Sequence, residues 1–323
     1  MKIFSLNKSI LAKNVLNKFQ SEEIDEQLKI EKFSDGEFCP IFKKSIRDED
    51  IFIMADGHSS EDIVKLLLTI DACKRSGAKS TSLIMPYLPY SRSDKNDHIR
   101  QSISSKLLAD VLSSVGISKL ITIDLHNPSI TGFYNVPVIH LKPNRIFIEY
   151  IKSLNLQNIC FVSPDHGATK RTLDFAKNFE GSTFAVIDKK RTKPNEVASM
   201  NLLNSVEGKN VIIIDDMGDT MSTICKASNL VIEKGALSVR AVLTHPVLSG
   251  ISMSNINESP LKELIVSDTI TSVYKKVYKY NQEMCWNKSG KLSPKINIIS
   301  CGDLLSNSIE NILKKKSIND INL

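Results

Sequence analysis

The chain has 323 residues, of which 41% are hydrophobic and 24% are charged, and its formal net charge is +6. A chain of this length and composition can bury one large core or two modest ones, and we expect two domains. No apolar run approaches the length of a membrane span, and the amino terminus lacks the apolar stretch of a signal peptide. We therefore expect a cytoplasmic protein that does not associate with a membrane.

The basic residues and the cysteines argue against two further classes of protein. The lysines are spread along the chain, and the one dense run, Lys314–Lys316, lies at a terminal helix. Anionic small substrates explain this charge at least as well as nucleic acid does, and we expect no nucleic-acid partner. The six cysteines are scattered and form no C-x-x-C pair, which predicts neither a zinc knuckle nor a disulfide framework.

Short apolar runs rich in β-branched residues alternate with helical patterns, which is typical of a parallel sheet covered on both faces. One amphipathic helix is predicted over Glu61–Arg75, with Ser59 as its cap and Gly77 as its end. Another is predicted over Ser102–Val115 and ends at Gly116. The predicted strands are Ile51–Ala55, Ser82–Met85, Leu120–Asp124, Ile159–Val162, Phe184–Ile187, Val211–Ile214 and Val239–Leu243.

The segment Val211–Ile224 joins an apolar strand to two adjacent carboxylates and then to a hydroxyl-rich turn that opens a helix. Backbone N–H groups in such a turn point at an anion, so the segment predicts a site for a phosphorylated sugar. The carboxylates would hold ribose hydroxyls and the turn would hold a phosphate. An N-cap role for the two carboxylates is an equally open interpretation of the local pattern. The residues assigned to this site are Asp215, Asp216, Asp219, Thr220, Met221, Ser222 and Thr223.

This segment resembles the phosphoribosyl-diphosphate motif of the type I phosphoribosyltransferases and of ribose-phosphate diphosphokinase. The second family is the better match, because further segments occur in its order and at its spacing. These segments are FSDGE (Phe33–Glu37), PYLPYSRSD (Pro86–Asp94), DLH (Asp124–His126), SPDHG (Ser163–Gly167), DKKR (Asp188–Arg191), THPVLSG (Thr244–Gly250) and VSDTI (Val266–Ile270). The resemblance implies an α/β fold of two Rossmann-like, phosphoribosyltransferase-type halves, each a mainly parallel sheet flanked by helices. We expect these halves at residues 1–141 and 142–323.

The reaction that the resemblance implies transfers the β,γ-diphosphoryl group of ATP to the C1 hydroxyl of ribose 5-phosphate, with Mg²⁺, and releases AMP. Such a transfer needs two aligned polyanions, a bridging metal ion and cations for the charge on the leaving group. The family match assigns catalysis to Lys189 and Arg191, at the start of a polar loop beyond the strand Phe184–Ile187. A solvated loop is the alternative for such a basic triplet.

The resemblance also assigns the metal and the nucleotide. His126 and Asp165 follow separate predicted strands, and we expect both at the same carboxyl edge of the sheet as Mg²⁺ ligands. Histidine is a poor ligand for hard Mg²⁺, and a hydrogen-bonded structural role is the other interpretation of His126. The ATP-binding residues implied by the match are Asp35, Gly36, Glu37 and Arg92.

Departures from the family pattern leave open which sugar phosphate accepts the diphosphoryl group. Ser93 replaces a usual glutamine, and His166 a usual small apolar residue. Met221 and Ser222 stand where the family has a small residue and glycine within D-T-x-G-T, and we expect them to narrow the approach to the phosphate. The change is either tolerated variation in an enzyme acting on ribose 5-phosphate, or a sign of a 5-substituted acceptor such as ADP-ribose.

Two other functional classes deserve comparison. A phosphoribosyltransferase would need neither FSDGE nor DKKR in family register. A catalytically silent regulatory homologue would have an interrupted catalytic loop, whereas Lys189, Arg191, His126 and Asp165 are all present, which favours an enzyme. The family implies a homo-oligomer built from dimers, such as a hexamer.

Overall fold

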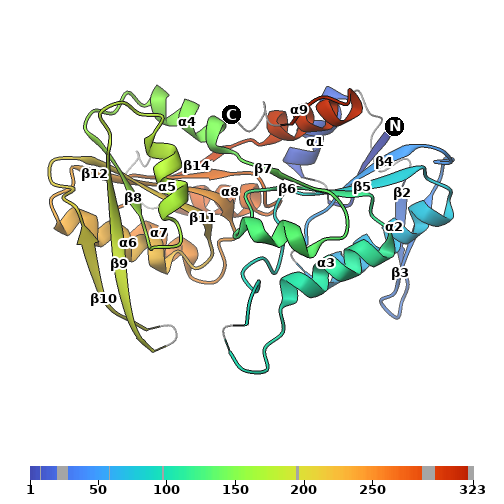
Figure 1. Cartoon of the computed structure of the whole chain (residues 1–323), viewed down its shortest axis with the longest axis horizontal. Helices are drawn as coiled ribbons and strands as arrows, with labels where there is room; N and C mark the ends of the chain where they lie inside the picture. The colour runs from blue at the N-terminus through green and yellow to red at the C-terminus, as the bar shows by residue number, and fades with distance from the viewer. Residues whose placement is uncertain are drawn as a thin grey trace. The chain divides into compact units, whose positions relative to one another are not determined.

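The computed structural model describes residues 1–7, 9–19, 28–57, 59–96, 98–193, 196–285 and 295–318, without the side chains of residues 189–199 and 280–285. The chain divides into two compact units. Unit 1 contains Met1–Lys142 and Gly302–Leu323, and unit 2 contains Pro143–Cys301 (Figure 1). No helix among the described residues is both long enough and apolar enough to cross a lipid bilayer.

The described part of unit 1 contains a five-stranded parallel sheet in the order β1-β4-β5-β6-β7, and a separate antiparallel hairpin of β2 and β3. The central strands are buried almost throughout, as expected for a parallel sheet covered by helices. The strands are β1 (Lys2–Ser5), β2 (Leu28–Lys32), β3 (Phe38–Phe42), β4 (Asp50–Met54), β5 (Ser80–Met85), β6 (Lys119–Ile123) and β7 (Val138–Leu141).

The helices of unit 1 begin and end with the expected chemistry. Ser59 caps α2 by accepting a hydrogen bond from the Asp62 N–H, and Gly77 follows the helix with φ of 77°. Gly116 ends α3 in the left-handed conformation that glycine adopts without strain. The helices are α1 (Ile10–Lys18), α2 (Ser60–Arg75), α3 (Ser104–Val115), the 3₁₀ helix η2 (Pro128–Phe133) and α9 (Gly302–Leu313).

The carboxyl-terminal helix α9 returns to unit 1 and packs beside α1 (Figure 1). Lys18 on α1 donates a hydrogen bond to Asn307 of α9 at 2.7 Å, and Leu305 and Ile309 of α9 are fully buried. The sequence placed residues 302–323 in the second half, because hydrophobic spacing shows which helix face is buried and not against which sheet it packs.

The described part of unit 2 contains a seven-stranded sheet in the order β10-β9-β8-β11-β12-β13-β14. Every neighbouring pair is parallel except β9 and β10, which form an antiparallel hairpin. The strands are β8 (Ile159–Ser163), β9 (Thr183–Lys193), β10 (Glu196–Leu203), β11 (Asn210–Gly218), β12 (Ser238–Pro246), β13 (Glu263–Ser267) and β14 (Ile296–Ile299).

Alternate residues of β11 enter separate cores on the two faces of this sheet. Val211 and Ile213 pack in the core that includes α6, whereas Ile212 and Ile214 pack in the core that includes α4 and α5. The expected sheet covered on both faces is therefore confirmed. The helices are α4 (Asn144–Ser153), α5 (Thr169–Ala176), α6 (Ser222–Glu233), α7 (Ser252–Glu258) and α8 (Val273–Cys285).

The predicted strands all occur, but β9, β11 and β12 continue at least three residues beyond their apolar runs, β12 as far as Pro246. β11 continues through both carboxylates to Gly218, which pairs with Pro246 of β12. β9 continues to Lys193 because it pairs with β10. The backbone of Lys189 and Arg191 therefore lies in a strand, and the prediction of a polar loop there is wrong; the side chains of both residues lie outside the described part.

Candidate functional site

The predicted sugar-phosphate segment forms a strand, a turn and a helix. Asp215 and Asp216 lie near the carboxyl end of β11, where Asp215 pairs with Leu243 of β12. The chain then turns through residues 219–221, and α6 begins at Ser222. The carboxylates and the start of the helix therefore lie within a single short connection at the carboxyl edge of the sheet, where α/β folds bind their ligands.

Three carboxylates gather at this edge. Asp216 is buried, and its N–H donates a hydrogen bond to Asp215 Oδ1 at 2.9 Å. Burial of the Asp215 carboxyl raises its pKa well above the ordinary value, and the negative charges of Asp216 and Asp165 raise it further. Asp165, which follows the neighbouring strand β8, is therefore close enough to act on the charge of Asp215. The structure thus brings a predicted metal ligand to the predicted ribose-binding pair.

Hydrogen bonds hold Asp165 in its turn. Its Oδ1 accepts from the Ala168 N–H at 3.2 Å, and its carbonyl accepts from Ser163 Oγ at 2.5 Å. The adjacent His166 places Nε2 3.0 Å from Asp188 Oδ1. Because Asp188 directly precedes Lys189 in β9, this contact joins the turn after β8 to the strand that carries the predicted catalytic pair.

The two predicted metal ligands do not share a sheet edge. His126 follows β6 of the sheet in unit 1, and Asp165 follows β8 of the sheet in unit 2. The expectation of one common edge is wrong, because local patterns place a residue at a strand end without showing which sheet that strand joins.

The carboxylates suit a metal ion shared with substrate better than a closed metal cage. Within the described ranges, no group of three or more histidine, cysteine, aspartate or glutamate side chains is arranged to hold a metal ion by itself. Mg²⁺ commonly binds one or two carboxylates, keeps several waters and takes its remaining ligands from substrate phosphates. The repulsion that raises the pKa of Asp215 is the kind that a divalent cation relieves.

Met221 packs into the core and not across the turn. Its side chain is 2% exposed and belongs to the same core as Leu243. A Cβ atom on Gly218 would lie 2.4 Å from Met221 Sδ and 2.5 Å from Leu243 Cδ1, so the glycine provides the space that the methionine fills. The expectation that Met221 narrows the approach to a phosphate is therefore wrong, because its backbone, with φ of 64°, directs the side chain inward.

The amino end of α6 has the features of an anion site. Among the described residues, no side chain caps α6, as is also true of α3, α4, α5 and α7, whereas Ser9 and Ser59 cap α1 and α2. The N–H groups of the first helical turn have no intrahelical acceptor, and the helix dipole adds a partial positive charge there. The backbone N–H groups of Ser222 and Thr223 are therefore candidate donors to an anion.

The loop after β12 supports the turn, and the predicted site residues did not include it. The N–H groups of Leu248 and Ser249 donate to the carbonyls of Gly218 and Asp219 at 2.9 and 3.1 Å, and Ser249 Oγ donates to Asp219 Oδ1. Lys276 of α8 donates to the carbonyls of Val247 and Leu248 at 2.6 and 3.1 Å. The THPVLSG match pointed to the loop, but no local pattern pointed to Lys276.

The charge of Lys276 reflects two opposing effects. Burial lowers its pKa from the usual lysine value, and the nearby negative charge of Asp219 opposes that shift. A lysine amino group is retained in this half-buried place because two carbonyls and a carboxylate compensate for the lost water. Lys276 therefore joins α8 to the loop after β12, which supports the sugar-phosphate turn of residues 219–221.

The predicted ATP segment FSDGE forms the tip of the exposed β2–β3 hairpin. Gly36 has φ of 95°, a conformation that favours glycine, and the Glu37 N–H donates to Asp35 Oδ1 at 3.0 Å. Arg92 is exposed on the loop that follows β5, elsewhere in unit 1. These residues are all accessible to a ligand.

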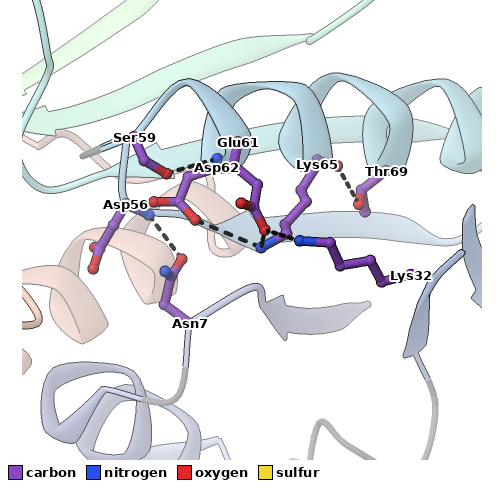
Figure 2. A network of polar contacts seen from close by, with 8 residues as sticks. All are labelled: Asn7, Lys32, Asp56, Ser59, Glu61, Asp62, Lys65 and Thr69. Carbon is purple, nitrogen blue, oxygen red and sulfur yellow. Dashed lines mark hydrogen bonds and ion pairs between the residues drawn. The ribbon is translucent and has the colours of Figure 1, made fainter. Parts of the chain in front are cut away.

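Charged contacts attach this hairpin to α2 (Figure 2). Lys32 from β2 reaches Glu61 of α2 at 3.3 Å, and Lys65, also on α2, reaches the same carboxylate at 3.0 Å. Both ammonium groups also lie over the ring of Phe38, at 5.1 and 4.6 Å from its centroid. Cation–π contacts at these distances add to the weak exposed ion pairs, so the hairpin is held on α2 by the Lys32–Phe38 pair directly beside its exposed tip.

A first prediction concerns the packing of Gly218 against Met221. Gly218→Ala should lower the free energy of unfolding by about 1–3 kcal/mol, because the added methyl group overpacks the core. Met221→Ala should cost less in the Gly218→Ala background than in the wild type, since it removes one of the two clashes and leaves only the one with Leu243. Urea unfolding of the four proteins measures this coupling.

Gly132→Ala is the matched control, because a Cβ atom there meets no other atom within 4 Å. Equal destabilisation by Gly132→Ala and Gly218→Ala, or additive effects in the double variant, would contradict this account of the turn.

A second prediction concerns the raised pKa of Asp215. The ionised carboxylate destabilises the fold above its folded-state pKa, and this penalty falls as the pH is lowered towards the unfolded value of 3.8. Asp215→Asn should therefore raise the thermal midpoint near neutral pH in the presence of a chelator, and its advantage should shrink in acid. The exposed Glu180→Gln should leave the midpoint unchanged, and an advantage that grows in acid would refute the assignment.

Comparisons with known proteins agree with this geometry. Residues 1–116 match the family described as the N-terminal domain of ribose phosphate pyrophosphokinase, and residues 177–321 match the phosphoribosyl synthetase-associated domain. The ribose-phosphate pyrophosphokinase of Porphyromonas gingivalis is 38% identical over 294 residues, covering 90% of this chain and 88% of the relative. That of Bacillus subtilis is 37% identical over 325 residues, covering 98% and 96%.

A solved structure extends the likeness to the fold. The phosphoribosylpyrophosphate synthetase of Mycobacterium smegmatis superimposes with a TM-score of 0.85 at 29% identity, over 97% of this chain and 99% of that one. The resemblance found in the sequence motifs is thus confirmed over nearly the whole chain. The protein belongs to the ribose-phosphate pyrophosphokinase family.

Proposed function

We propose that this protein transfers the β,γ-diphosphoryl group of ATP to the C1 hydroxyl of ribose 5-phosphate, with Mg²⁺, giving phosphoribosyl diphosphate and AMP. The observation that carries the proposal is the connection from β11 to α6. There the carboxylates of Asp165, Asp215 and Asp216 lie near the start of α6, which no side chain of the described residues caps. This combination suits a ligand that has both hydroxyl groups and a phosphate.

The turn supports ribose 5-phosphate as the acceptor. Asp215 and Asp216 would accept hydrogen bonds from ribose hydroxyls, while backbone donors from Asp219 to Thr223 would hold the 5-phosphate. ADP-ribose was the alternative because Met221 was expected to obstruct a compact phosphate. That side chain is buried in the core, so the reason for preferring a 5-substituted acceptor disappears.

The nucleotide would be bound by residues of unit 1. Asp35, Gly36 and Glu37 lie at the exposed tip of a hairpin that is held on α2 beside that tip, and Arg92 would stack on adenine or pair with a phosphate. Asp165 and, on family grounds, His126 are the residues that would hold Mg²⁺, which would reduce the negative charge of the ATP phosphates.

The chemical step would be an in-line displacement. The C1 hydroxyl oxygen would form a bond to the β-phosphorus and release its proton to solvent, the bond from that phosphorus to the oxygen bridging it to the α-phosphate would break, and AMP would leave with that oxygen. Lys189 and Arg191 would stabilise the negative charge that develops on AMP. The His166–Asp188 contact supports this role, because it attaches β9 beside Lys189 to the turn that carries Asp165.

The proposal is tested by incubating the purified protein with ATP and Mg²⁺, plus ribose 5-phosphate, ADP-ribose or no acceptor, and measuring AMP. We expect AMP with ribose 5-phosphate and little with ADP-ribose. Release of AMP only with ADP-ribose would show that ADP-ribose, and not ribose 5-phosphate, is the acceptor. No release of AMP with any acceptor would favour a regulatory homologue.

A third prediction concerns the catalytic pair. Lys189→Ala and Arg191→Ala should each lower kcat by a factor of about 10²–10³, the loss typical of removing one transition-state charge contact. The thermal midpoint should change little. Lys190→Ala, between the two, is the control and should keep near-normal turnover, so equal losses for all three variants would count against the assignment.

A fourth prediction concerns assembly. Exposed apolar side chains lie on two helices of unit 1 that contact each other, with Val64 48% and Leu68 37% exposed on α2 and Leu107 62% and Val111 36% exposed on α3. These exposed apolar side chains support a homo-oligomer built from dimers. Light scattering at micromolar concentration should give a mass of at least twice 36.0 kDa, and a sharp monomer mass would contradict it.

A further inference from the structure

Asn255 on α7 contacts two points of the sugar-phosphate turn. Its Nδ2 donates hydrogen bonds to the Thr220 carbonyl at 2.7 Å and to Ser222 Oγ at 3.3 Å. Ser222 Oγ also lies 3.2 Å from Thr220 Oγ1. The hydroxyl of Ser222 is thereby held between a residue of the turn and a residue of a different helix.

The Ser222 hydroxyl is a potential competitor for the ligand of the turn. A serine hydroxyl hydrogen-bonds readily to backbone N–H groups close to it in the sequence, and Ser222 is the first residue of α6. A rotation of Ser222 towards those groups would occupy donors that a phosphate requires. Glycine, which the family has at this position, cannot compete in this way.

We propose that Asn255 is a positioning residue for the sugar phosphate: it holds the Ser222 hydroxyl away from the N–H groups at the start of α6 and leaves those groups for the 5-phosphate. This inference rests on the proposed function of the turn. It also explains how a serine is accommodated here, since the added hydroxyl has its own hydrogen-bond partners in Asn255 and Thr220.

The helix that carries Asn255 is anchored independently of this side chain. Lys295 Nζ donates to the carbonyls of Ile256, Asn257 and Ser259 at 3.2, 2.9 and 3.0 Å. Ile256 is fully buried in the core of unit 2. Replacing Asn255 should therefore release Ser222 without displacing α7.

The test uses Asn255→Ala, Ser222→Gly and the double variant in the full-length chain, with steady-state kinetics for both substrates and thermal unfolding. Asn255→Ala should raise KM for ribose 5-phosphate about tenfold, which corresponds to the loss of one or two hydrogen bonds. Its kcat, its KM for ATP and its thermal midpoint should stay close to wild type. Adding Ser222→Gly should restore KM, because the competing hydroxyl is then absent.

Asn257→Ala is the matched control, since Asn257 is an exposed asparagine on the same helix and contributes only its carbonyl to Lys295. It should behave as wild type. If Asn255→Ala unfolds, Asn255→Leu, which keeps the volume without the donors, takes its place.

An unchanged KM in Asn255→Ala would overturn the inference. So would a raised KM that Ser222→Gly fails to restore, because Asn255 would then act through the general fold of the turn. Failure of the proposed function is separate, since it appears as no AMP from the wild type with ribose 5-phosphate. In that event, the binding of ribose 5-phosphate to the same variants is measured by calorimetry. The inference holds if Asn255→Ala raises the dissociation constant and the added Ser222→Gly restores it.

Discussion

Burial of the Asp215 carboxyl beside the carboxylates of Asp216 and Asp165 is the electrostatic constraint that the end of β11 has to accommodate. Burial and neighbouring negative charge together raise the pKa of Asp215, so holding this group in place costs stability near neutral pH. The cost is borne by a sheet with an apolar core on each face, in which Val211 to Ile214 are buried. Such a rigid strand can present destabilising groups at its end, and that is where a cation and a polar sugar would be bound.

The turn between β11 and α6 shows how a backbone proposed to bind a phosphate accommodates two larger side chains. Met221 occupies space that Gly218 leaves open, and Ser222 is held by Asn255 and Thr220. Both larger side chains are thus turned away from the ligand side, one into the core and the other towards α7. The N–H groups at the start of α6 depend on backbone conformation, so they tolerate these substitutions provided that the supporting contacts change with them.

Some of this arrangement could be predicted from the sequence, because it depends on local patterns. Buried runs such as Ile159–Val162 identify parallel strands, and Ser59 and Gly116 mark helix ends. The β9–β10 hairpin was missed because its polar residues resemble a solvated loop until antiparallel pairing is known.

Tertiary contacts determine the rest. The inward direction of Met221 follows from a positive φ and from the space over Gly218, neither of which a motif comparison reveals. His126 and Asp165 both follow strands, yet only the strand order shows that these belong to different sheets. Asn255 has no signal in the sequence, because its role depends on the position of α7 beside the turn.

The electrostatics of the turn connect its two proposed roles, which are to bind a phosphate and to lie beside a bound cation. Neutral backbone donors and a helix dipole attract phosphate at the start of α6, within the same short segment as Asp215, Asp216 and Asp219. These carboxylates repel the anion that the donors attract. Lys276 offsets one of them, since it lies close enough to Asp219 to interact with its charge while its ammonium group holds the Val247 and Leu248 carbonyls. The remaining negative charge, on the β11 carboxylates and Asp165, favours a cation at the place where two polyanionic substrates would have to meet.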